Sequence, residues 1–239
     1  NGHRAALRSI ARVVEDTAPL QDESEAREGI LELLREHRPL VITGAGVSTE
    51  SGIPDFRGAK GFYHQEREIP LEQVLSIDFF TVHPQAYWEW FHEIYRPVEP
   101  NGAHRALASL EAAGRLDAVI TQNIDGLHQA AAEEVGSSSP VIDLHGSLDR
   151  VVCLKSGHLF DRDWVQEQLT ALNPDFAALA GIDPIDVETA PDGDVDLEET
   201  AHFRVLNCPI CGGLLKPDVV YFGDAVPAAR VEVAAEICD

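Results

Sequence analysis

The sequence contains no methionine, only four cysteines and few basic residues, and each shortage narrows the possible classes of protein. Four cysteines in 239 residues do not make the dense disulfide framework of a small secreted domain. The opening residues do not match a secretory signal peptide, so we expect a reducing compartment. The low lysine content suggests a bacterial source, so we expect the protein in a bacterial cytoplasm, with the mitochondrial matrix as the alternative. The missing methionine and an ending that reads as mid-helix lead us to expect a longer native chain.

Long apolar runs and basic patches are also missing. No run approaches the roughly 18 apolar residues that a membrane-spanning helix needs. Lys and Arg number 18 against 41 Asp and Glu, which gives a net charge of -23. Direct binding to nucleic acid or to an anionic membrane is therefore not expected, whereas a basic peptide would be attracted. Residues 182–199 carry eight carboxylates and no basic residue, and we interpret them as a solvated loop, with partner binding as the alternative.

Short apolar runs that end in polar or glycine-rich loops predict the main strands. They lie at residues 39–43, 117–121 and 140–146, with a fourth candidate at 218–224. Helical patterns at 103–114 and 125–134 alternate with them, which predicts an α/β fold with a parallel sheet and helices on both faces. In such sheets, ligands bind beyond the carboxyl ends of the strands.

A further helix is predicted at residues 22–38, ahead of the first strand. Asp22 is placed to cap it, with Glu25 three residues later. One face of this helix carries Ala26, Ile30, Leu33, Leu34 and His37.

The loop after the first strand begins with Gly44, Ala45 and Gly46. Such a turn can present backbone N–H groups to phosphate oxygens. The dinucleotide fingerprint of dehydrogenases also needs a third glycine, where this chain has Thr49, and an acid closing the next strand. A tight structural turn therefore explains these glycines as well as a phosphate site does.

Three further loops carry polar groups suited to chemistry. Asp55, Phe56 and Arg57 lie between glycines, which predicts either a mobile loop that folds over a ligand or a plain surface turn. His145 ends a buried strand and is either a general base or a histidine bonded to the sheet. The neighbouring strand end supplies amide and carboxylate groups that can bind ribose hydroxyls and a carboxamide, namely Gln122, Asn123 and Asp125.

The cysteines pose a separate question. Cys208 and Cys211 form a Cys-x-x-Cys pair, but the matching position after Cys153 is Ser156, with His158 two residues further on. Tetrahedral zinc needs four donors, and a serine hydroxyl is a poor one at neutral pH. We expect Cys238, in the final helix, to be a buried apolar residue.

Taken together, these loops resemble the sirtuins, the NAD-dependent protein-lysine deacylases. The matching segments, in family order, are "GAGVSTESGIPDFRG", "TQNIDGLH", "LHGSL", "CPICGG" and "LKPDVVYFGD". The resemblance runs from about residue 25 to the end and is greatest to the class II branch. It implies a Rossmann-like sheet made by residues 1–60, 100–147 and 215–239, whose C-terminal part is expected to be missing. A smaller lobe would combine a helical insertion, 61–99, with a zinc-ribbon module, 148–214.

The resemblance also implies roles for individual residues. His145 and Asn123 would be catalytic, with His145 deprotonating a ribose hydroxyl after nicotinamide leaves. The added strand of a substrate peptide would pair with Val219, Val220, Phe222 and Gly223. Zinc would be held by Cys153, Cys208 and Cys211, with His158 ahead of Ser156 or water as fourth donor. NAD would be bound by Gly44, Ala45, Gly46, Ser48, Asp55, Phe56, Arg57, Gln122, Asn123 and Asp125.

The expected reaction removes an acyl group from a lysine side chain and gives nicotinamide and O-acyl-ADP-ribose. Two alternatives use the same cofactor contacts: mono-ADP-ribosyl transfer to protein, with lipoamidase-like activity, and non-catalytic binding of NAD or ADP-ribose. The residues that would grip an acidic acyl chain are replaced by Phe91 and Ile94, so we expect poor activity on succinyl-lysine. The preferred acyl group, the target proteins and the oligomeric state are not encoded in any motif.

Overall fold

The computed structural model describes residues 22–58, 61, 71–88, 98–137, 140–174 and 203–238. The chain divides into two compact units, Asn1–Pro39 and Leu40–Asp239. The acidic run 182–199 and the acyl-pocket positions Phe91 and Ile94 lie outside the described residues. No helix within the described ranges has the length and apolar character needed to cross a membrane.

The first unit contains one described helix, α2, Glu23–Glu36. Asp22 caps it as predicted, because its carboxylate accepts hydrogen bonds from the backbone N–H groups of Ser24 and Glu25. None of the residues of α2 is buried, and Ile30 on its apolar face is 58% exposed.

Three parallel strands form the sheet predicted from the sequence, in the order β1-β2-β3. The pairing register places Thr43 beside Thr121 and Thr121 beside Asp143, so the strands end at one common edge. The strands are β1, Leu40–Thr43; β2, Ala118–Thr121; and β3, Val141–Asp143. The expected strands at 39–43 and 117–121 are therefore confirmed. The third, expected at 140–146, is present but ends at Asp143, because residues 144 and 145 form a turn and Gly146 begins a strand of another sheet.

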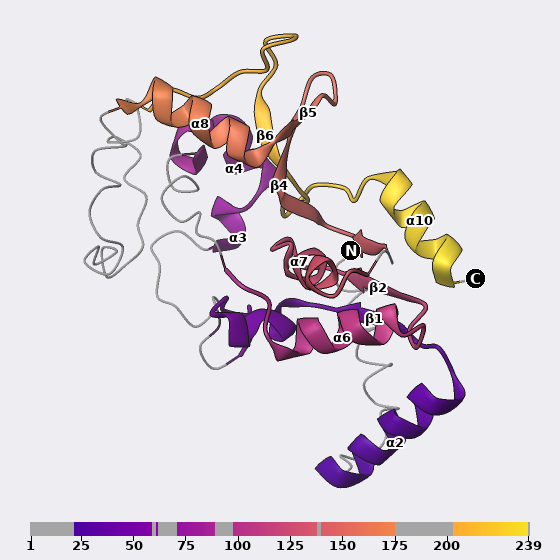
Figure 1. Cartoon of the computed structure of the whole chain (residues 1–239). Helices are drawn as coiled ribbons and strands as arrows, with labels where there is room; N and C mark the ends of the chain where they lie inside the picture. The colour runs from indigo at the N-terminus through magenta and orange to yellow at the C-terminus, as the bar shows by residue number, and fades with distance from the viewer. Residues whose placement is uncertain are drawn as a thin grey trace, which may run out of the picture. The chain divides into compact units, whose positions relative to one another are not determined.

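Helices cover both faces of this sheet, also as predicted (Figure 1). Successive side chains of a strand point to opposite faces. Ile120 and Ile142 pack with Ala234 of α10, Ala228–Cys238, whereas Thr43 contacts α7, Leu127–Glu134. A short 3-10 helix, η1, Ala45–Ser51, follows β1, and α6, Gly102–Ala112, leads into β2.

The chain leaves the parallel sheet immediately after β3 and builds a second, antiparallel sheet. Gly146 has a φ of +87° and its position leaves no room for a Cβ, since one would lie 1.8 Å from the carbonyl oxygen of Asp218. The strand order is β5-β4-β6, and the helix α8, Arg162–Leu172, lies beside β4 and β5 (Figure 1). The strands are β4, Gly146–Cys153; β5, Leu159–Asp161; and β6, Leu215–Val219.

The fourth strand expected at 218–224 is wrong in both its bounds and its sheet. The strand is β6, and it pairs antiparallel with β4 instead of extending the parallel sheet. The apolar residues beyond it serve a different purpose, because Phe222 forms a parallel bridge with Ser76. The Val220 N–H pairs with the His145 carbonyl and the Phe222 N–H with the Leu75 carbonyl, so this segment connects the end of β3 to the helical insertion.

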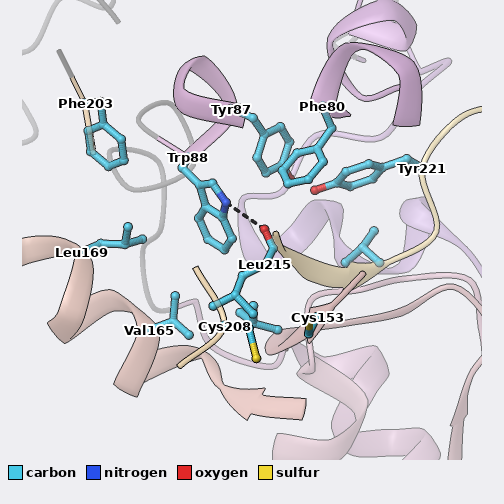
Figure 2. Packing of buried hydrophobic residues seen from close by; sticks show 12 residues of the cluster. Phe80, Tyr87, Trp88, Cys153, Val165, Leu169, Phe203, Cys208, Leu215 and Tyr221 are labelled. Atoms are coloured by element: carbon cyan, nitrogen blue, oxygen red, sulfur yellow. Dashed lines mark hydrogen bonds between the residues drawn. The ribbon is translucent and has the colours of Figure 1, made fainter. Parts of the chain in front are cut away.

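The largest apolar core belongs to the second sheet (Figure 2). Trp88 is 1% exposed and donates a hydrogen bond from its indole nitrogen to the carbonyl oxygen of Leu215 at 3.1 Å. The insertion contributes Ile77 and Phe80 from the short helix α4, Ile77–Val82, which follows another short helix, α3, Leu71–Val74. Residues 84–88, which include Trp88, are also helical. Cys153 and Cys208 are part of the same cluster, so the thiols lie at the edge of a well-packed core.

Candidate functional site

The loops that follow the three parallel strands meet at the carboxyl edge of the sheet. The backbone N–H of Gln122 donates to the carbonyl of Thr43 at 3.0 Å, and that of Leu144 donates to Thr121 at 2.9 Å. These bonds continue the strand pairing by one residue on each side. The loops beginning at Gly44, Gln122 and Leu144 are therefore held against one another.

Ser48 lies at the centre of the site and connects two of these loops. Its hydroxyl donates to Asp125 Oδ2 at 2.6 Å and accepts a hydrogen bond from Asn123 Nδ2 at 3.0 Å. Asp125 Oδ1 in turn accepts from the backbone N–H of Leu127 at 3.0 Å, where α7 begins. Ser48 is fully buried and Asn123 is 9% exposed, so these bonds are formed away from bulk water.

His104 of α6 contacts Ser48 from the opposite side. Its Nδ1 accepts a hydrogen bond from the backbone N–H of Asn101, so the proton of the neutral ring is on Nε2. Nε2 lies 3.4 Å from Ser48 Oγ and faces its remaining lone pair. Burial lowers the pKa of His104, partly offset by the charge of Asp125, and this favours the neutral ring.

His145 lies just beyond β3, at the same edge. Its Nδ1 lies 3.1 Å from the carbonyl oxygen of Gln122, which can only accept, so Nδ1 carries the proton. The lone pair of a neutral imidazole is then on Nε2. The His145 carbonyl also accepts from the backbone N–H of Val220 at 2.9 Å, which ties the histidine to the chain after β6.

The glycine loop leaves space beside its backbone. A Cβ built on Gly44 or on Gly46 would meet no atom within 4 Å. The loop is held from outside by Asn101, whose Nδ2 donates to the Val47 carbonyl at 2.8 Å. An anchored glycine backbone with open space beside it fits an approaching phosphate group.

The loop that carries Asp55, Phe56 and Arg57 is closed by a turn. Asp55 Oδ1 accepts a hydrogen bond from the Gly58 backbone N–H at 2.9 Å, and a Cβ at Gly58 would lie 2.5 Å from that carboxylate. A side chain at position 58 would therefore displace the Asp55 carboxylate from this turn. Phe56 is half-buried and Arg57 is exposed, so Asp55 has a structural partner while Arg57 extends toward solvent.

The four predicted peptide-binding positions differ in what their backbones already bind. Val219 belongs to β6 and pairs with Gly146. The N–H of Phe222 donates to Leu75 and its carbonyl accepts from Ile77, so both groups of this residue are paired. An added strand at this edge would have to use other groups, such as those of Gly223.

Three thiols lie together at the edge of the second sheet, and two of them, Cys153 and Cys208, are drawn in Figure 2. The sulfur atoms of Cys153, Cys208 and Cys211 all lie within 4.8 Å of one another. Two short backbone turns hold them, with Gly157 donating to the Cys153 carbonyl and Gly212 to the Cys208 carbonyl, each at 2.8 Å. Three clustered thiols on paired turns match a structural zinc site.

Ser156 and His158 both border this cluster. Ser156 Oγ lies 3.2 Å from Cys211 Sγ and 2.7 Å from His158 Nδ1, which itself is 3.6 Å from Cys208 Sγ. Tetrahedral zinc with ordinary Zn–S and Zn–N bonds separates a sulfur from a nitrogen by roughly 3.6 Å. Among the described residues, the potential metal-binding atoms that all lie within 4.8 Å of one another are the three sulfur atoms, and the set does not include a nitrogen of His158.

The three clustered cysteines differ from the fourth cysteine, Cys238, in their surroundings. The hydrogen bond from Ser156 lowers the pKa of the Cys153 thiol to about 6, which favours the thiolate that metals bind. Cys238 is exposed on α10, so the expectation that it is a buried apolar residue is wrong. The end of α10 turns this side chain away from the sheet, whereas Ala234 and Ile237 face it.

Two buried histidines lie behind the site, and neither was predicted from the sequence. His104 and His128 are 0% and 4% exposed, and their rings lie 4.8 Å apart. Each lies on a predicted helix, but neither follows a metal or catalytic spacing. The sequence did contain one signal for these two residues. Each is a histidine on the apolar face of a helix that lies next to the end of a strand at the candidate site.

The sequence matches the Sir2 family model over residues 44–239. It is 45% identical over 216 residues to NAD-dependent protein deacetylase 1 of Streptomyces coelicolor, covering 87% of this chain and 67% of that protein. It is 43% identical over 220 residues to NAD-dependent protein deacetylase 1 of Mycobacterium avium, covering 88% and 72%.

Solved Sir2 structures share the fold. One, bound to an acetylated peptide, is 30% identical with a TM-score of 0.61 and covers 88% of this chain and 70% of that chain. Another, with a deacetylated p53 peptide and 3'-O-acetyl ADP-ribose, is 32% identical with a TM-score of 0.62, covering 88% and 71%. This chain therefore belongs to the Sir2 family.

Proposed function

We propose that this chain is an NAD-dependent protein-lysine deacylase that releases nicotinamide and O-acyl-ADP-ribose. The observation that carries the proposal is the convergence of Ser48, Asn123, Asp125 and His145 beside an open glycine loop. The names of the curated relatives and the acetylated peptide of a related structure support the same activity.

The residues of the site have distinct proposed roles. NAD supplies the ribose carbon to which the acyl oxygen is transferred. Gly44, Ala45 and Gly46 face its diphosphate, while Asp125 and Asn123 orient the nicotinamide ribose through their shared contact with Ser48. Gln122 fixes the ring of His145, so that Nε2 accepts a proton from a ribose hydroxyl.

The proposed substrate is an acyl-lysine in a peptide that adds a strand next to Gly223. Because both backbone groups of Phe222 are already paired, its side chain, which is 42% exposed, would contact the peptide instead. The net charge of -23 favours lysine-rich partners over nucleic acid or anionic membranes.

The zinc site is proposed to be structural. Cys153, Cys208 and Cys211 would each donate a thiolate, and the fourth donor would be His158. Bound zinc would crosslink β4 to the chain leading into β6, which stabilises the module without reaching the reacting atoms. The proposed domains remain a Rossmann-like lobe and a zinc module over residues 148–214. The boundary at residue 148 falls within β4.

We further propose a cytoplasmic location, with the mitochondrial matrix as the alternative. The bacterial sources of the relatives and the free thiols of the described cysteines support it.

The test is a panel of lysine peptides carrying acetyl, succinyl and long-chain acyl groups, incubated with labelled NAD. We expect nicotinamide release that depends on the peptide, with label recovered in a small acylated product. Label on protein would favour ADP-ribosyl transfer, and binding without turnover would favour a non-catalytic module. A clear preference for succinyl-lysine would contradict the poor activity on this substrate expected from Phe91 and Ile94.

A further inference from the structure

A second layer of buried hydrogen bonds lies behind the candidate site. Thr121, the last residue of β2, is 2% exposed. Its hydroxyl oxygen accepts a hydrogen bond from the backbone N–H of Asn123 at 3.0 Å. This bond sets the direction in which the chain leaves the strand and therefore where the Asn123 side chain begins.

The Thr121 hydroxyl is itself held from the neighbouring strand. Thr43 Oγ1 donates to Thr121 Oγ1 at 2.9 Å, so the last residues of β1 and β2 are joined through their side chains. Thr43 Oγ1 also lies 2.9 Å from His128 Nε2. Because the Thr43 proton is already used, Nε2 must carry the proton and donate it to Thr43.

His128 reaches Thr43 from α7, and the helix places it in a dry environment. The ring is 4% exposed and lies edge-on to His104 at 4.8 Å between centroids. Burial, with a smaller contribution from His104, lowers the pKa of His128 to about 4, against an opposing effect of Asp125. The imidazole is therefore neutral near pH 7 and available as a single-proton donor.

These bonds form one directed relay from His128 to Thr43, then to Thr121, whose oxygen receives the Asn123 amide. The other end of Asn123 is fixed by Ser48. The relay fixes the backbone of Asn123, whereas Ser48 fixes its side-chain NH2 group. The side-chain oxygen of Asn123 is therefore held in one place. Loss of the relay would leave buried polar groups without partners, which is costly.

We propose that His128, acting through Thr43 and Thr121, is a positioning residue that sets Asn123 for its contact with the NAD ribose. This inference rests on the proposed function of Asn123. His128 touches neither the glycine loop nor His145 through any hydrogen bond found among the described residues.

Paired variants test the relay. Thr43→Val and His128→Leu remove a link at nearly constant volume, whereas Thr43→Ser and His128→Gln keep a hydroxyl and an N–H donor at the corresponding positions. Thr170→Val is the matched control, because it deletes a part-buried hydroxyl that bonds to the Gln166 carbonyl within α8. Thermal melting identifies any variant that fails to fold.

Two measurements are made on each folded variant: amide hydrogen exchange at Asn123, and kcat/KM for NAD with an acyl-peptide. We expect Thr43→Val and His128→Leu to accelerate exchange and lower kcat/KM about tenfold, since a buried partner is lost. The Ser and Gln variants should retain most of both properties, and Thr170→Val should match the wild type.

The proposal is overturned if Thr43→Val leaves Asn123 exchange unchanged, or if nitrogen NMR finds the His128 proton on Nδ1. If the wild type itself releases no nicotinamide, the proposed function fails. The exchange rates and the His128 tautomer then still decide whether the relay positions Asn123.

Discussion

Ser48 and Asp125 are joined by a 2.6 Å hydrogen bond across 77 positions of the sequence. The same serine oxygen accepts from Asn123 and faces His104, so one buried hydroxyl connects the glycine loop, the second strand end and α6. The position of the Asp125 carboxylate therefore depends on Ser48, which acts through its hydrogen bonds and takes no part in a reaction.

Removing this hydroxyl should disable the site more than it weakens the fold. Ser48→Ala leaves three partners, two in the loop after β2 and one on α6, without their hydrogen bond, and we expect kcat/KM for NAD to fall about 10- to 100-fold. Steady-state kinetics with an acyl-peptide measures the effect. Ser109→Ala is the control, since its hydroxyl bonds only to the Arg105 carbonyl on the exposed side of α6. Equal activity in both variants would contradict the role of Ser48.

Gly146 should tolerate no side chain. Its φ is +87° and a Cβ would lie 1.8 Å from the Asp218 carbonyl oxygen, so Gly146→Ala should cost more than about 3 kcal/mol or prevent folding. Gly102→Ala, where a Cβ meets nothing within 4 Å, should change the free energy of unfolding by less than about 1 kcal/mol. Urea denaturation compares the two, and similar stabilities would show that β4 can leave β3 by another path.

Stability should fall in mild acid because of the buried histidine pair. The folded-state pKa of His128 is lowered to about 4 and that of His104 is also lowered, mainly by burial, with Asp125 opposing and Arg105 assisting at His104. The unfolded chain therefore binds more protons between about pH 6.5 and pH 4. The contribution to stability is complete above pH 6.5 and is lost as the pH falls toward 4.

Urea denaturation at pH 7.5 and pH 5.0 measures this loss, which we expect to be about 1–2 kcal/mol for His128 after allowance for solvent screening. His128→Gln should reduce the difference between the two pH values. A variant with the same pH dependence as the wild type would show that His128 titrates normally.

The metal site should depend on three thiols and on one weaker donor. Cys208→Ser should lose zinc, whereas His158→Ala should bind zinc with lower affinity, because a neighbouring hydroxyl or water replaces a nitrogen ligand. Metal analysis and competition with a chelator measure both. Full zinc affinity in His158→Ala would remove His158 from the site, and Ser156→Ala would then test the hydroxyl.

Zinc loss should lower the melting temperature before it affects nicotinamide release, since the thiols border the apolar core of the second sheet. The melting curve and the initial rate are compared after partial removal of the metal. Activity lost in parallel with zinc at unchanged stability would contradict a structural role.

The parallel sheet could be predicted because each strand is a short apolar run that ends in a polar loop. The helix capped by Asp22 was equally accessible, since its capping residues are local. β4 and β6 could not be placed, because the left-handed turn at Gly146 redirects the chain after β3. A glycine in the sequence does not show which sheet the following strand will join.

The residues at the carboxyl edge of the parallel sheet were predictable, and those behind them were not. Asn123, Asp125 and His145 follow strands directly, so the rule for parallel sheets selects them. Thr43, His104 and His128 gain their roles from contacts between distant segments, such as the bond between Thr43 and His128 across 85 positions. Their side chains are also common in ordinary cores, so no spacing distinguishes them.

The most direct test of the account is nicotinamide release from NAD by the wild type and by His145→Tyr, each with and without an acetyl-lysine peptide. We predict peptide-dependent release by the wild type, with one deacylated peptide for each nicotinamide. His145→Tyr should lose deacylation while its circular dichroism spectrum and melting temperature stay close to those of the wild type. Full deacylation by the folded His145→Tyr variant would contradict the assignment of His145 as the base.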